Sequence, residues 1–181
     1  MRSLRLQLTV TMLSLALCGT ASAQEQSEIR GLLSVRFAHA FEQSDLDVGD
    51  KCDDSQGIEI GAGFQPGEHF AFLLGYEWQT DNDFDTHYFP VTVRAYSPAL
   101  LENVRLYATV GLGVVFTRLY NDLEPNGNQR AAAFHAGGGL ELELNENVGI
   151  LVYTKYKRGL GEVDGFESVV SGIGVQYRWG L

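Results

Sequence analysis

Hydrophobic and polar residues alternate along the last fourteen residues of the chain, Ser168 to Leu181. Apart from one serine, every second position is apolar or aromatic, and this phase ends on Tyr177, Trp179 and Leu181. The positions between them hold mostly glycine and polar groups. A period of two predicts a β-strand. The run is longer than the ~5–6 residues of an ordinary globular strand and suits the ~9–11 residues that a tilted strand needs to cross a bilayer.

Seven earlier segments show the same alternation. The eight predicted strands cover residues 33–38, 58–65, 70–78, 89–96, 104–116, 134–144, 148–157 and 168–181. No charged residue occurs in the apolar phase of any of them. This pattern predicts an all-β protein, an eight-stranded antiparallel up-and-down transmembrane β-barrel.

The connections between the predicted strands fall into two groups. Those at 66–68, 97–103 and 145–147 are short, and those at 42–55, 80–86, 118–130 and 158–165 are mostly longer. Transmembrane barrels have short periplasmic turns and longer outer loops. With an even number of strands, both termini then lie on the short-turn side, so we expect both in the periplasm of a Gram-negative bacterium.

Alternation alone also fits a soluble barrel with its apolar side chains inside. The aromatic residues of the apolar phase, however, gather near both ends of the strands, as in the girdles of membrane barrels. They are Phe64, Phe70, Tyr177 and Trp179 toward the turns and Trp78, Phe89, Phe116, Phe134 and Tyr156 toward the loops. The opposite phase is rich in glycine and carries charges of both signs, which suits a narrow lumen filled by side chains. We therefore expect the apolar phase to face lipid.

The first residues have the features of a secretory signal peptide. Arg2 and Arg5 are followed by an apolar run from Leu6 to Leu17 and by the small residues Ala21-Ser22-Ala23. This order predicts cleavage after Ala23. Residues 1–23 are then the signal peptide, and residues 24–181 form a single transmembrane barrel domain.

The mature chain is strongly acidic. Without Arg2 and Arg5 it retains 11 basic and 23 acidic residues. Because no basic surface stands out, nucleic acid is not an expected partner. Cys52 is its only cysteine, so no internal disulfide can form.

The sequence resembles the OmpA/OmpX-type eight-stranded outer-membrane barrels, a superfamily that includes the opacity-type adhesins. The resemblance runs from Ile29 to Leu181 and is most specific at residues 104–113 (VRLYATVGLG) and 174–179 (GVQYRW). It implies that the terminal strand, with Tyr177, Trp179 and Leu181, is the signal read by the barrel-assembly machinery. Members usually end on Phe or Trp, whereas Trp179 is followed here by Gly180-Leu181.

Ten charged residues of the polar phase are predicted to face the lumen. They are Arg36, Glu59, Glu77, Arg94, Arg105, Glu141, Glu143, Lys155, Lys157 and Arg178. Because an unpaired charge in a narrow lumen is costly, opposite charges should pair. Two interpretations stay open: the pairs plug the barrel, or they line a small ion-conducting pore.

The loop lengths predict particular cross-strand partners in the lumen. Residues whose numbers sum to about 95 should pair across the first loop, which places Arg36 opposite Glu59. A sum of about 248 across the third loop places Arg105 opposite Glu143, and Tyr107 opposite Glu141. Directly opposed residues on one face have Cβ atoms ~4.5–5.5 Å apart, close enough for ion pairing.

A third hypothesis is a lipid A-modifying enzyme, because some barrels of this fold act on lipid A. Such a hydrolase needs a nucleophile within reach of a base. None of the four histidines is followed two positions later by a serine, so we predict no catalytic residue and no enzymatic activity.

The acidic loops favour surface interactions. The segment Asp45-x-Asp47-x-Gly49 departs from a calcium-binding loop at Gly49 and Gln56, so we predict no metal site, and no other cofactor. The expected partners are outer-membrane lipid, lipopolysaccharide and host or other surface ligands at the loops, and we expect a monomer.

Overall fold

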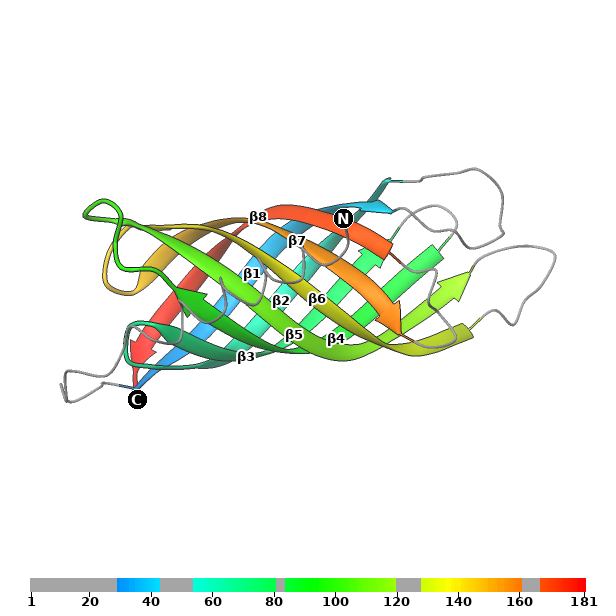
Figure 1. Ribbon diagram of the computed structural model, residues 1–181, viewed down its shortest axis with the longest axis horizontal. Coiled ribbons are helices and arrows are strands. Elements are labelled where there is room, and N and C mark those ends of the chain that lie inside the picture. The colour runs from blue at the N-terminus through cyan, green and yellow to red at the C-terminus, as the bar shows by residue number, and fades with distance from the viewer. Residues whose placement is uncertain (1–28, 43–53, 81–83, 120–127, 161–166) are drawn as a thin grey trace, which may run out of the picture.

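The computed structural model of the chain describes residues 29–42, 54–80, 84–119, 128–160 and 167–181. They form eight strands: β1 (Ile29–Glu42), β2 (Asp54–Pro66), β3 (Phe70–Thr80), β4 (Phe84–Tyr96), β5 (Val104–Leu119), β6 (Asn128–Glu143), β7 (Val148–Leu160) and β8 (Glu167–Gly180). Each strand pairs antiparallel with the next, and β8 pairs with β1 to close the barrel. The start of β1 and the end of β8 lie at the same end of the cylinder (Figure 1). The predicted fold class is confirmed.

The register gives the barrel its tilt. We start at Phe70 on β3 and step from each residue to its directly paired neighbour on the next strand. One circuit through β4–β8, β1 and β2 ends at Thr80, ten residues further along β3. A stagger of this kind requires strands inclined by about 35–45° to the barrel axis. Figure 1 shows this inclination. The lumen is therefore narrow enough for side chains from opposite walls to meet.

Three short turns, 67–69, 97–103 and 144–147, join the strands at one end of the barrel, which we call the turn end. The other end, the loop end, carries connections of eleven, three, eight and six residues at 43–53, 81–83, 120–127 and 161–166. The second and fourth of these are shorter than the seven-residue turn at 97–103, so loop length distinguishes the two ends on average and not at every connection.

Several strands reach further toward the loop end than the hydrophobic pattern predicts. β4 begins at Phe84 instead of residue 89, and β6 begins at Asn128 instead of residue 134. The outward positions of these extensions include Asp85, His87 and Arg130, which interrupt the apolar phase. The strands continue beyond the belt of outward apolar side chains. Their backbone hydrogen bonds therefore extend past the point where the alternating hydrophobic pattern ends.

The two faces of the barrel are inverted relative to a soluble protein. Large apolar side chains are exposed on the outside all around the cylinder, for example Leu74 at 68% and Leu112 at 63%. The buried side chains include many polar and charged ones. An apolar exterior around a polar interior is the arrangement of a transmembrane barrel. The predicted orientation of the two phases is thus confirmed.

Within the described residues, no helix is long and apolar enough to span a membrane. The predicted signal peptide (residues 1–23), Cys52 and the Asp45–Gly49 segment lie outside the described residues.

Candidate functional site in the lumen

Five charged residues form a cluster in the loop half of the lumen. This loop-side cluster consists of Arg36, Glu59, Glu77, Lys155 and Lys157. Lys155 Nζ lies 2.7 Å from Glu59 Oε1 and also contacts Glu77 Oε1. Arg36 lies 3.2 Å from the second oxygen of Glu59, and Lys157 lies 3.4 Å from the second oxygen of Glu77. Each carboxylate is thus shared between two cations.

The loop-side cluster crosses the barrel. Glu59 and Glu77 are directly opposed on the neighbouring strands β2 and β3, whereas Lys155 lies on β7, four strands away from β3. In an eight-stranded barrel, four strands separate opposite walls. Lys155, only 3% exposed, therefore spans the lumen and compensates two carboxylates that would otherwise repel each other.

A second group lies at the turn end of the lumen. This turn-side cluster consists of Arg94, Arg105, Glu141, Glu143, Gln176 and Arg178. Arg178 contacts Glu141 and lies 3.5 Å from Glu143, which is in turn 3.3 Å from Arg105. Gln176 Nε2 donates a hydrogen bond of 3.1 Å to Glu141.

Arg94 also spans the lumen. It lies on β4, and its Nη1 donates a 2.6 Å hydrogen bond to Gln176 Oε1 on β8, at the opposite wall. The same nitrogen donates to Tyr96 Oη at 3.1 Å, and the guanidinium lies 4.6 Å from the Tyr107 ring centroid. The lumen is therefore crossed at two levels.

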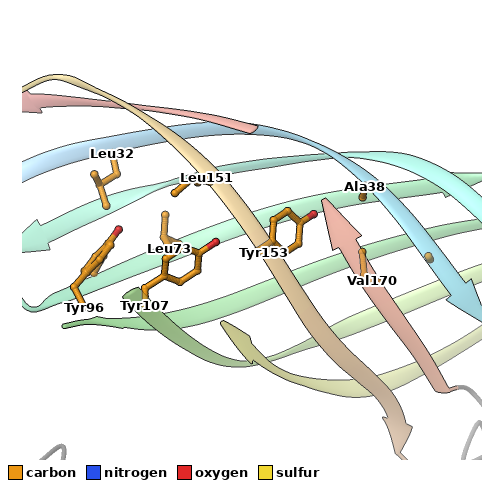
Figure 2. Close-up of a cluster of buried hydrophobic side chains, with 10 residues drawn as sticks. Leu32, Ala38, Leu73, Tyr96, Tyr107, Leu151, Tyr153 and Val170 are labelled. Atoms are coloured by element: carbon orange, nitrogen blue, oxygen red, sulfur yellow. The ribbon is translucent and has the colours of Figure 1, made fainter. Parts of the chain in front are cut away.

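Aromatic side chains fill the space around these clusters. Tyr153 lies beneath Arg36 at 5.0 Å, and Tyr88 lies 5.7 Å from Lys157. Tyr88 Oη is also 3.0 Å from Nδ1 of the buried His135. Figure 2 shows Tyr96, Tyr107 and Tyr153 inside the barrel, together with aliphatic side chains. Aromatic rings and charged side chains therefore contact one another inside the barrel.

Inward-facing glycines make room for these long side chains. A Cβ at Gly174 would collide with Arg36, and a Cβ at Gly149 would collide with Glu141. At Gly139 the added atom would lie 2.9 Å from the Tyr107 hydroxyl.

One predicted register is confirmed and one is wrong. Arg36 faces Glu59, as predicted. Across the third loop, however, Arg105 faces Glu141 and Tyr107 faces Gly139, a shift of two residues. The predicted register would have placed Arg118 opposite Arg130, and like charges directly opposed destabilise a sheet. The observed register places Arg118 opposite Asn128 instead. Arg105 still forms an ion pair with Glu143, as a diagonal neighbour.

The ten lumen residues expected from the sequence lie in these two clusters. The sequence analysis missed Gln176, which links Arg94 to Glu141. Its signal was a long polar side chain in the inward phase, two residues after Gly174, on the same strand as Arg178. Because Gln176 is neutral, it does not appear among the ten charged residues predicted to face the lumen.

The residues of the expected assembly signal face outward. Tyr177 and Trp179 are 48% and 37% exposed, and their rings stack at 6.1 Å near the turn end of β8. Leu181 follows the strand and is exposed. Among the residues that the structure describes, no group of three or more His, Cys, Asp or Glu could hold a metal ion.

Fold and lumen together define an eight-stranded transmembrane β-barrel with charged side chains in its interior. The chain belongs to the family described as "Outer membrane protein beta-barrel domain", whose model matches residues 10–178. Its place is therefore the outer membrane.

The fold is shared with solved outer-membrane barrels. The attachment invasion locus protein Ail of Yersinia pestis is 18% identical with a TM-score of 0.61, covering 84% of this chain and 99% of its own. Neisserial surface protein A is 16% identical with a TM-score of 0.70, covering 82% and 97%. The N-terminal barrel of Pseudomonas aeruginosa OprF is 16% identical with a TM-score of 0.62, covering 82% and 97%. A comparison with curated proteins gave no match. At these identities the likeness shows the fold alone.

Proposed function

We propose that this protein is a non-enzymatic outer-membrane barrel whose lumen is closed by ion pairs and whose acidic loops interact at the cell surface. The observation that carries the closed lumen is the reach of Lys155 from β7 to Glu59 and Glu77 on the opposite wall. A hydrated ion would have to displace side chains that are almost fully buried and doubly paired. A small ion-conducting pore is the alternative that the experiments below exclude or establish.

The proposed orientation places the loop end outside the cell and both termini in the periplasm. It is supported by the connections at the end where β1 begins and β8 ends, which are shorter on average than those at the other end. Delivery requires removal of residues 1–23 and insertion by the barrel-assembly machinery. Tyr177, Trp179 and Leu181 are exposed on the terminal strand, where that machinery can read them.

A lipid A-modifying activity is the third candidate, and His135 is not placed to serve it. A lipid substrate lies outside the barrel, whereas His135 is only 2% exposed inside it. It hydrogen-bonds Tyr88 and Thr92 in the lumen wall. The imidazole therefore fills the interior and is remote from the lipid face.

The surface role rests on the charge of the loops. The four loop segments 43–53, 81–83, 120–127 and 161–166 contain ten acidic residues and one basic residue. Ail has been solved in complex with the heparin analogue sucrose octasulfate. Loops as acidic as these would repel such a polyanion. They favour cationic surface ligands, or divalent ions that bridge to lipopolysaccharide phosphates.

The closed lumen is tested by ion efflux from proteoliposomes. Wild-type protein should release trapped ions no faster than protein-free vesicles. The double substitution Lys155→Ala with Glu77→Ala removes two crossing side chains without changing the net charge, and it should raise efflux. Equal, rapid efflux from both proteins would show that the wild-type lumen already conducts.

The surface role is tested by lipopolysaccharide binding to the protein in nanodiscs with and without Mg²⁺. Binding should depend on Mg²⁺ in the wild type. It should be lost when Asp45, Asp47, Asp50 and Asp53 are replaced by Asn. Unchanged binding by that variant would contradict the role of the acidic loop.

A further inference from the structure

Charge is not balanced within the turn-side cluster. Arg94, Arg105 and Arg178 face two carboxylates, Glu141 and Glu143. Arg178 contacts both carboxylates, and Arg105 lies against Glu143. One positive charge is therefore left over at this level of the lumen.

The surplus belongs to Arg94. Within the described part of the chain, no carboxylate oxygen lies within ion-pair distance of its guanidinium, which is 1% exposed. Its contacts are the neutral Tyr96 hydroxyl, the neutral Gln176 amide and the face of Tyr107. A lysine could shed its proton in such a place, but arginine stays protonated in proteins. The cluster therefore holds one positive charge that has no carboxylate of its own.

Two donors on side chains that contact each other lack acceptors. Among the described residues, Arg94 Nε and the Tyr107 hydroxyl are buried without a hydrogen-bond partner. Tyr107 is 5% exposed, and its ring lies against the Arg94 guanidinium. Buried polar groups are normally satisfied, so orphaned donors beside an uncompensated cation point to an acceptor that carries negative charge.

We propose that the turn half of the lumen binds a small inorganic anion, such as chloride, between Arg94 and Tyr107. The anion accepts hydrogen bonds from Arg94 Nε and from the Tyr107 hydroxyl, and it neutralises the third arginine. The narrow lumen selects for small size. Glu141 Oε2, which also has no hydrogen-bond partner, sets a limit by repelling a second anion or a multivalent one. The site does not depend on whether the barrel conducts.

The test compares the stability of the folded barrel in potassium chloride with its stability in potassium gluconate at equal concentration. Stability is measured by urea unfolding in lipid. A ligand that binds only the folded state stabilises it by mass action. With a dissociation constant of about 10 mM, about 300 mM chloride would raise the folding equilibrium constant about 30-fold. Gluconate is a much larger monovalent anion and supplies the same ionic strength.

Two variants separate this site from general salt effects. Arg94→Gln should abolish the difference between chloride and gluconate. Arg130→Gln removes a cation from the outer face of β6 and should preserve it. No difference in the wild type, or a full difference in Arg94→Gln, would overturn the proposal.

A second approach applies if Arg94→Gln fails to fold. Tyr107→Phe keeps the charge of Arg94 and removes one donor, so it should weaken the chloride effect several-fold. Crystals of the wild type grown in bromide should show an anomalous peak beside Arg94 Nε. Absence of that peak would also overturn the proposal.

Discussion

Replacing Lys155 with Met should test whether the loop-side cluster holds the barrel together. The substitution keeps an unbranched side chain of similar length but removes the charge. Glu59 and Glu77 then oppose each other directly across β2 and β3 with one cation fewer between them. Arg36 still lies against Glu59, and Lys157 still lies against Glu77.

The magnitude follows from the burial of the cluster. Lys155 is 3% exposed, Glu77 is 2% exposed and Glu59 is fully buried. Removing one partner from a buried ion pair costs about 3–5 kcal/mol because it leaves a buried charge uncompensated. With a urea dependence of about 2 kcal/mol per molar, typical of small proteins, the unfolding midpoint should fall by about 2 M.

Urea unfolding in lipid, followed by gel mobility without boiling, measures this shift. Val152→Met introduces the same side chain on the lipid face of the same strand and should change stability by no more than about 0.5 kcal/mol. Adding Glu77→Gln to Lys155→Met should recover part of the loss, because it removes the carboxylate left with one cation fewer. If Lys155→Met is as stable as Val152→Met, or if the double variant loses the sum of both single effects, the cross-lumen pair does not stabilise the barrel.

Three further predictions follow from the same structure. Leu112→Arg places a charge on the lipid face and should destabilise the barrel by about 2–4 kcal/mol. Gly111→Arg should fail to fold because its side chain collides with the lumen wall. Equal stability of Leu112→Arg and wild type in lipid would reverse the assignment of faces. Glu143→Ala leaves Arg105 without its carboxylate and should lower the free energy of unfolding by about 1 kcal/mol, because this pair is partly exposed. Combining it with Arg105→Ala should recover part of that loss in urea unfolding. Strictly additive losses would show that the two residues do not interact. In a Cys52→Ser background, Asn126→Cys should react with a membrane-impermeant maleimide in intact cells, and protection of this thiol in a correctly inserted barrel would invert the proposed topology.

The sequence predicts the strands and their faces well because lipid outside and charge inside impose a strict period of two. The same signal fails at the loop ends. There His87 and Arg130 stand in outward positions above the apolar band, and the strands continue without it. The register of β5 and β6 was missed by two residues because loop length alone does not show that Arg118 avoids Arg130.

The pairing of neighbouring strands does not predict which side chains meet across the lumen. Lys155 meets Glu77, and Arg94 meets Gln176, from strands that share no ladder. Only the tilt and closure of the whole barrel bring them together. The sequence therefore predicts which side chains enter the lumen, but not which of them meet.

The closed lumen is tested most directly by single-channel recording of the purified wild-type protein in planar bilayers. The ion pairs that join opposite walls predict a silent membrane, with no steps of current from folded, inserted barrels. Regular, reproducible conductance steps from the wild-type protein would show an open path through the lumen and contradict the account.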